Sequence, residues 1–272
     1  MIIKKTLTVL LIIILLLIVD IYFEVNYAKI ENIVLKSKKL PKGKTLKILH
    51  ISDVHNKKFS GKTRNLLNDI KKLDPDIIAL TGDIIDGRTT DFKNIYHLTE
   101  ELVKINASTY FVSGNHEWRN PKTKEFMKGL KKRNIKIINN SNEIITKDTF
   151  SINVCGIDDP YTNHDDTVKA FNNISKSNFT LLLSHSPNIV LKKNNLPCDL
   201  VLCGHTHGGQ IRLPFIGGLI APGQGYFPKY DKGIYRIDND TVLYINSGFG
   251  TSSLPIRFLN RSQVSLITLT GE

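Results

Sequence analysis

Short apolar runs alternate with amphipathic stretches from residue 45 onward. Three runs have the length and composition of buried strands: 45–53, 75–83 and 108–117. Three stretches carry apolar residues at helical spacing: 61–74, 91–105 and 122–134. This alternation predicts a parallel sheet covered by helices. Further strand-like runs follow and make the second half richer in strands: 135–139, 142–146, 150–156, 179–185, 199–205, 233–237, 241–248 and 264–270.

The N-terminus follows a different pattern. From Leu7 to Val19 every residue except Thr8 is strongly apolar, and two lysines precede the run. About 17 apolar residues at a rise of 1.5 Å cover roughly 25 Å, which is short for a membrane span but sufficient. No A-x-A pattern follows, which favours an uncleaved anchor over a removed signal peptide. We therefore predict a membrane anchor at 1–23, a juxtamembrane connector at 24–44 and one large domain at 45–272.

Residues of metal-ligand type stand at the ends of five predicted strands. The motifs are Asp53-Val54-His55, Gly82-Asp83-Ile84-Ile85-Asp86, Gly114-Asn115-His116-Glu117, Ser184-His185 and Gly204-His205-Thr206-His207. In open α/β sheets the ligand crevice lies outside the carboxyl ends of the strands, so we expect these five groups to converge. Five of the eight histidines belong to them, which argues against an assignment as ordinary loop residues.

The donor types in these motifs point to divalent metal. Carboxylate, imidazole and amide without thiolate suit Mn, Fe, Zn, Co or Ni. A carboxylate such as Asp83 has two oxygens and is able to bind two cations at once. Gly82, Gly114 and Gly204 precede ligands, where a side chain would crowd the site and the backbone must turn sharply.

Composition and charge narrow the classes of protein. A chain of 272 residues with 41% hydrophobic residues has room for one large α/β domain. The formal charge of +12 would suit nucleic acid or an anionic membrane, but the lysines are spread along the chain. We therefore expect a solvated basic surface and no specific nucleic-acid partner. Three cysteines are too few for a disulfide framework and are expected to be small buried residues.

The ordered series D-x-H, G-D-x-x-D, G-N-H-E, S-H and G-H-x-H resembles the calcineurin-like metallophosphoesterases from about residue 45 to the C-terminus. The stretches CGHTHGGQIRLPFIG (203–217) and NSGFGTSSLPIR (246–257) resemble the membrane-anchored bacterial branch related to UDP-2,3-diacylglucosamine pyrophosphatases. The resemblance implies an α/β fold, a four-layer αββα sandwich of two mixed sheets flanked by helices, preceded by an N-terminal membrane helix. Residues 45–272 would then be the catalytic domain.

The resemblance also implies a ligand set for two divalent ions. One ion would be held by Asp53, His55, Asp83 and His207, and the other by Asp83, Asn115, His185 and His205. His116 would protonate the leaving oxygen without binding metal, a role that suits imidazole because its pKa lies near neutral pH. Asp86 would orient a ligand. Glu117 stands where many members carry aspartate and, as it is no ligand, is expected to matter little.

These roles predict hydrolysis of a phosphodiester or pyrophosphate bond. A hydroxide held between the two ions would attack phosphorus in line. The anchor favours a lipid-linked or envelope substrate. Arg119, Arg212 and Arg257 are candidate substrate-binding residues. For Arg212 and Arg257 we favour structural salt bridges, and for Arg119 a capping or packing role is the alternative. The branch often carries an R-P-E-I-like stretch where this chain has Arg-Ser-Gln-Val at 261–264, a departure that bears on substrate detail.

Two other functions would use the same residues. A nuclease or nucleotide phosphatase is the alternative enzyme, and a non-catalytic metal-binding scaffold is disfavoured because every expected ligand and His116 are present. The anchor places the protein in the cell membrane. Lys4 and Lys5 favour an extracytoplasmic domain, whereas the lysines between 36 and 47 favour the opposite orientation. The sequence does not indicate which proteins, if any, bind to the chain.

Overall fold

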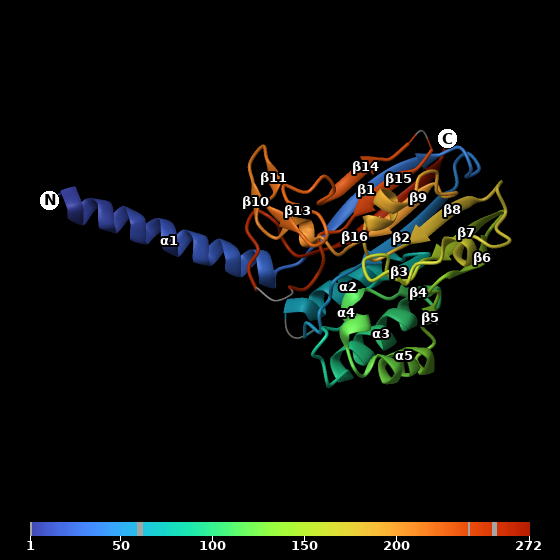
Figure 1. The fold of residues 1–272 in the computed structure, drawn as a ribbon, viewed down its shortest axis with the longest axis horizontal. Helices are drawn as coiled ribbons and strands as arrows, with labels where there is room; N and C mark the ends of the chain where they lie inside the picture. Colours follow the sequence, from blue (N-terminus) through green and yellow to red (C-terminus); the bar gives the residue numbers. More distant parts are fainter. Residues whose placement is uncertain (1, 59–61, 239, 252–254) are drawn as a thin grey trace.

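The computed structural model describes residues 2–58, 62–238, 240–251 and 255–272 (Figure 1). The predicted anchor and the predicted helix at 61–74 each begin on a residue outside these ranges. Three residues of the stretch 246–257 also lie outside them.

Two six-stranded sheets form the body (Figure 1). The first has the order β1 (Lys29–Ser37), β16 (Gln263–Gly271), β2 (Thr45–Ile51), β3 (Ile77–Thr81), β4 (Thr109–Val112) and β5 (Lys136–Ile137). The second has the order β14 (Gly233–Arg236), β15 (Val242–Ile245), β9 (Leu200–Cys203), β8 (Phe179–Leu183), β7 (Phe150–Gly156) and β6 (Ser141–Lys147). Both sheets are mixed, because β16 runs antiparallel to β2, β14 to β15, and β6 to β7.

Helices cover the outer face of each sheet. The helices on the first sheet are α2 (Lys62–Leu73), α3 (Lys93–Ile105) and α5 (Thr123–Lys132). Those on the second are the short α6 (Thr167–Ala170) and α7 (Asn188–Lys192). A third apolar cluster lies between the sheets and joins residues such as Ile48 to Leu181. These layers are the αββα sandwich implied by the sequence motifs, and that prediction is confirmed.

Burial on both faces explains why the central strands are continuous apolar runs. All five residues of β3 are buried. Ile77 and Ala79 pack in the cluster between the sheets, while Ile78 and Leu80 pack against the helices. A parallel strand covered on both sides therefore needs apolar residues at every position rather than at every second one.

Helix α1 (Ile2–Asn26) projects from the body (Figure 1). None of its 25 residues is buried. It is long and apolar enough to cross a membrane by length and composition. Its far end carries the chain's N-terminus, and its near end meets the body beside residues 260–262, which precede β16.

The stretch 24–44, expected to be a connector, contains strand β1, which the sequence analysis did not predict. β1 pairs in parallel with β16 along its whole length, from Lys29 opposite Gln263 to Ser37 opposite Gly271. Because β1 lies at a sheet edge, only one of its residues is buried and its apolar pattern is weak. The sheet therefore begins three residues after α1 ends.

Candidate active site

The five motifs converge at the carboxyl ends of five strands. Asp53 and His55 follow β2, Asp83 follows β3, Asn115 opens the short helix α4 (Asn115–Arg119) after β4, His185 follows β8, and His205 and His207 follow β9. Three groups of side chains bring ligand atoms within 4.8 Å of one another: Asp53 with His55 and His207, His55 with Asp83 and His116, and Asp83 with His185 and His205. The groups share members, so they form one continuous cluster.

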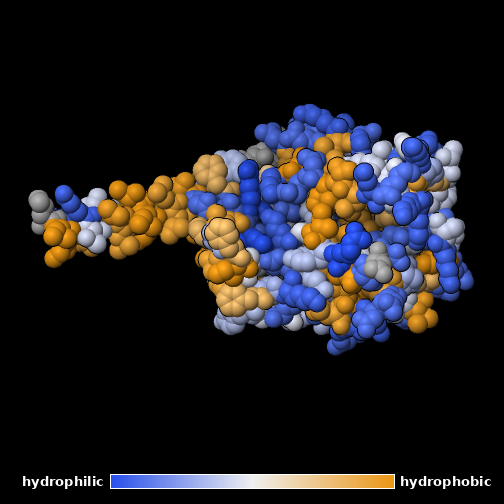
Figure 2. All heavy atoms as spheres, turned by 90° about the horizontal axis from the view of Figure 1, so that it is seen from above, coloured by the Kyte–Doolittle hydropathy of each residue, from blue (hydrophilic) through white to orange (hydrophobic). Residues whose placement is uncertain are grey.

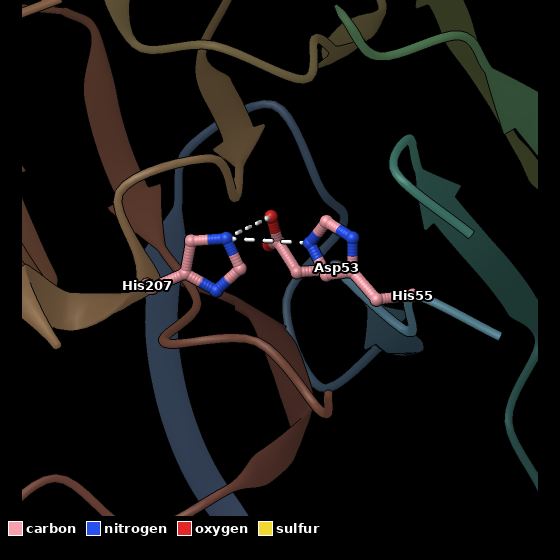
Figure 3. A group of neighbouring side chains, drawn as sticks. All are labelled: Asp53, His55 and His207. Carbon is pink, nitrogen blue, oxygen red and sulfur yellow. Dashed lines mark hydrogen bonds and ion pairs between the residues drawn. The ribbon is translucent and has the colours of Figure 1, made fainter. Parts of the chain in front are cut away.

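The first group joins β2 to the segment after β9 (Figure 3). His207 Nε2 lies 3.6 Å from Asp53 Oδ1 and 3.3 Å from His55 Nε2. The Asp53 carboxylate is held by the Ser52 hydroxyl at 2.6 Å and by the backbone N–H of His205 at 3.1 Å. Two imidazole nitrogens therefore face each other beside a fixed carboxylate.

Asp83 lies at the centre of the cluster. Its Oδ1 accepts the backbone N–H of His116 at 2.7 Å. Its Oδ2 faces three imidazoles, with Nε2 of His185 at 3.1 Å, of His55 at 3.9 Å and of His116 at 4.0 Å. One oxygen is thus anchored to backbone while the other points at the groups that surround it.

His185 is oriented by a backbone carbonyl. Its Nδ1 lies 2.8 Å from Thr81 O, so Nδ1–H donates there and Nε2 is left to face the cluster. His205 Nδ1 lies 3.1 Å from that Nε2. This is a second pair of imidazole nitrogens that face each other.

Burial and charge set the protonation of these groups. Burial lowers the pKa of His55 to about 4, that of His205 to about 3, and that of His207 well below its ordinary value. Burial also acts on Asp83 and His185, but their mutual attraction outweighs it, so the pKa of Asp83 falls and that of His185 rises. A proton on His185 therefore stabilises the ionised Asp83 carboxylate, as a cation bound at the same place would.

The side chains of the cluster are suited to binding divalent metal ions. Asn115 Oδ1 is buried and has no hydrogen-bond partner among the described residues. A buried acceptor without a partner costs roughly 1–3 kcal/mol, which a bound ligand would offset. Neutral imidazoles, carboxylates and one amide oxygen around a shared Asp83 are a donor set for borderline-hard cations.

The backbone at the site is strained, as functional sites often are. Five predicted ligands have a left-handed φ: Asp53 (51°), His55 (48°), Asp83 (49°), His205 (71°) and His207 (50°). The three glycines allow close approach, as predicted. A Cβ on Gly82 would lie 2.6 Å from Gly114 N, and one on Gly114 or Gly204 would overlap the carboxylate of Asp83 or Asp53.

His116 stands at the mouth of the cluster. Its Nδ1 lies 3.1 Å from the N–H of Gly87, which donates to it, and 3.4 Å from Asp86 Oδ2. A neutral His116 therefore carries its proton on Nε2, the atom that faces Asp83. A pocket of about 400 Å³ adjoins the ring and is lined by Asp86, Gly87, Arg88, His116 and Arg119. Arg88 was not among the predicted residues.

Glu117 has a larger structural role than the sequence analysis expected. It is fully buried. Its Oε2 accepts the N–H groups of Asp83 (2.8 Å) and Gly114 (2.7 Å), and its Oε1 accepts those of Ile84 and Ile85. Glu117 therefore holds the turn that carries Asp83. A glutamate at the third position of a helix that accepts the N–H of the N-cap residue is the glutamate half of a capping box, a sequence signal that was missed.

Arg212 and Arg257 have protein partners. Arg212 Nη1 lies 2.8 Å from Asp231 Oδ2, a structural salt bridge of the kind favoured from the sequence. Arg257 is 1% exposed, and its guanidinium donates to four backbone carbonyls, of Ser247, Gly248, Gly250 and Asn260. We therefore assign Arg257 the structural role favoured from the sequence, although its partners are backbone carbonyls and not a carboxylate. Arg257 holds the loop that packs against Asp53.

Comparison with known proteins finds a phosphoesterase family and relatives named as metallophosphoesterases. The family model of calcineurin-like phosphoesterases matches residues 46–209. The "Uncharacterized metallophosphoesterase YkuE" of Bacillus subtilis is 30% identical over 254 residues, which cover 91% of this chain and 87% of that protein. A "Transmembrane protein with metallophosphoesterase domain" of Danio rerio is 26% identical over 268 residues, which cover 92% of this chain but 60% of that protein.

Solved structures share the fold. The NAD nucleotidase of Haemophilus influenzae superposes with a TM-score of 0.51 at 18% identity, over 77% of this chain. The match spans 46% of that longer chain. At this identity the likeness concerns the fold alone.

Proposed function

Because the chain belongs to the calcineurin-like phosphoesterase family, whose members are metal-dependent phosphoester hydrolases, we propose that it cleaves a phosphodiester or pyrophosphate bond with two divalent ions. The observation that carries this proposal is Asp83, because one of its oxygens faces both His55 and His185, which are assigned to different ions. A single carboxylate in that position suits a bridge between two cations.

In this proposal the two ions divide the predicted ligands. Asp53, His55, Asp83 and His207 hold one ion, and Asp83, Asn115, His185 and His205 hold the other. Ions of the Mn, Fe, Zn, Co or Ni type suit this set. When bound, they would lower the pKa of a coordinated water and offset charge on the phosphoryl oxygens.

The chain's own residues then bind substrate and move a proton. As an imidazolium, His116 would donate its Nε2 proton to the leaving oxygen as the P–O bond breaks and would return to neutral imidazole. Asp86 Oδ2 lies 3.8 Å from Nδ1 of the ligand His55, which it would orient, and 3.4 Å from Nδ1 of His116, where it would stabilise the imidazolium. Arg88 and Arg119 line the adjoining pocket, where their guanidinium groups suit phosphate oxygens.

We further propose that α1 anchors the enzyme in the cell membrane and that the substrate is lipid-linked, of the UDP-diacylglucosamine type. The length and apolar composition of α1 support anchoring. The resemblance of 203–217 and 246–257 to the membrane-anchored branch supports the substrate class. Lys4 and Lys5 at the far end of α1 support an extracytoplasmic body.

The test uses the full chain in detergent, stripped of metal and reloaded with manganese. We expect hydrolysis of bis-p-nitrophenyl phosphate that depends on the metal. Asp83→Asn should lose both metal and activity, whereas His116→Ala should keep metal and lose roughly 10²–10⁴ in kcat. Asp69→Asn, the same change on the exposed face of α2, is the matched control.

Absence of turnover with all five candidate metals, despite tight metal binding, would leave a strict specificity for the lipid-linked substrate or a non-catalytic scaffold. Failure to cleave a UDP-linked lipid pyrophosphate as well would contradict the hydrolase mechanism. The substrate class is tested separately, by comparing a UDP-linked lipid pyrophosphate with nucleoside monophosphates. A higher kcat/KM for the nucleotides would replace the lipid-linked substrate by the nucleotide phosphatase alternative.

A further inference from the structure

An exposed apolar surface lies at the end of the body where α1 emerges. Two small hairpins carry most of it, β10–β11 (Arg212–Leu213 with Gly217–Gly218) and β12–β13 (Ile220–Ala221 with Gly225–Tyr226). We call it the hairpin patch, and its exposed residues are Phe215 (110%), Ile216 (60%), Ile220 (44%), Tyr226 (73%), Phe227 (62%) and Leu259 (48%). Contiguous exposed apolar surface of this kind marks an interaction site.

The segment 258–262 ties the hairpin patch to the end of α1. The Arg212 N–H donates to Phe258 O at 3.0 Å, which joins this segment to the first hairpin. The Asn260 N–H donates to Glu24 Oε2 at 2.6 Å, and the Ser262 N–H donates to Glu24 O at 2.9 Å. Leu259 is therefore exposed between the hairpins and the helix.

The position of the apolar part of α1 determines where the hairpin patch would lie relative to a bilayer that α1 crosses. That part ends at Phe23, and Glu24 already bonds to the body. The body therefore begins at the level where the helix would leave a bilayer. Figure 1 places β10, β11 and β13 at the end of the body next to α1, and Figure 2 shows hydrophobic residues continuing from the helix onto that end.

The composition of the hairpins suits a lipid–water interface. Residues 211–230 contain no aspartate or glutamate, and Arg212 and Lys229 are their only charged residues. Aromatic and aliphatic side chains flanked by basic ones are typical of segments that lie in the interfacial region of a membrane.

We propose that the hairpin patch inserts into the interface of the same bilayer that α1 crosses. This inference rests on the proposed membrane anchor. The patch is also linked to the site, because Asn260 Nδ2 donates to His207 O at 2.6 Å. Docking through the patch fixes the orientation of the body on the membrane and holds the metal cluster close to the lipid head groups.

The test measures the depth of single labelled positions in the full chain. Phe215→Cys and Phe227→Cys each receive an environment-sensitive fluorophore, since the three native cysteines are buried. Leu15→Cys reports on α1. Val168→Cys is the control, because it is 82% exposed on α6, which packs on β6 away from α1. The chain is reconstituted in phosphatidylethanolamine–phosphatidylglycerol vesicles that contain a lipid with a nitroxide near the head group.

We expect the nitroxide lipid to quench the labels at 215 and 227 at least about twofold more than the label at 168, because interfacial side chains lie roughly 5–10 Å into the membrane. Equal quenching at these positions, with the label at 15 in lipid, would overturn the inference and leave the anchor standing. Labels at 215 and 227 shielded from aqueous iodide but not quenched by the lipid would mean that protein covers the patch, which also overturns it. A label at 15 that remains in water would instead refute the anchor.

Discussion

Replacing Arg257 by lysine separates a structural from a substrate-binding role for this residue. The change keeps the positive charge, so it alters the geometry of donation and leaves the net charge of the chain unchanged. Arginine offers several N–H donors in a planar fork, whereas lysine offers three on a single nitrogen at the end of a shorter stem.

The expected loss of stability follows from the four hydrogen bonds that Arg257 donates. Nη2 donates to the carbonyls of Ser247 (2.7 Å), Gly248 (3.1 Å) and Gly250 (2.7 Å), and Nη1 donates to Asn260 O at 3.1 Å. One ammonium is unable to serve both sets, so at least one bond is lost, at about 1.5–3 kcal/mol for a charged donor. Burial already lowers the pKa of Arg257 to about 10, and an ammonium is costlier still to desolvate. We expect a total loss of about 2–4 kcal/mol.

The assay is urea unfolding of the full chain in detergent, followed by the fluorescence of its single tryptophan, Trp118. With a slope of roughly 2 kcal/mol per molar urea, the midpoint should fall by about 1–2 M. Arg236→Lys on the exposed side of β14 is the control and should leave the midpoint nearly unchanged. An unchanged midpoint for Arg257→Lys together with a raised KM would refute the structural role and restore the substrate contact.

Three further predictions concern metal affinity and the stability of the turns that carry the ligands. Glu117→Gln leaves one acceptor oxygen for four N–H donors, so manganese affinity by calorimetry should fall roughly 10–100-fold, while the exposed Glu125→Gln should not change it. The carboxylate of Asp83 raises the pKa of His185 above its ordinary value, and burial raises the pKa of Asp53 to about 6. Metal displaces these protons, so affinity should fall roughly tenfold per pH unit below neutrality and more steeply below pH 6, and a constant affinity from pH 8 to 5.5 would contradict this. Gly204→Ala places a methyl group on the Ser52 hydroxyl and should lower stability by about 1–3 kcal/mol, measured as a fall in Tm.

The strand-end motifs were predictable because two simple rules combine. Strands buried on both faces are continuous apolar runs, which is how β3 and β9 were found. The carboxyl ends of parallel strands share an edge of the sheet, so polar residues that follow several runs must meet. Both rules need only the local sequence and the parallel topology.

Other features had no local signal. Strand β1 is an exposed edge that becomes a strand by pairing with β16, more than 200 residues later. The partners of Arg257 are backbone carbonyls three to ten residues away in the one connection between β15 and β16, and no side-chain pattern in that stretch marks them. The hairpins at 211–230 have the glycines and prolines of ordinary turns, and nothing in their sequence indicates that they lie beside α1.

The sequence alone therefore determined the types of ligand, the strands that carry them, the glycines that make room and the apolar helix. These properties depend on periodicity and on residues close together in the chain. Only the tertiary structure decided that Asp83 lies among three imidazoles, that Glu117 holds its turn, and that the hairpin patch adjoins α1. Those contacts join segments far apart in sequence, and burial and pairing energies there depend on neighbours that no local pattern specifies.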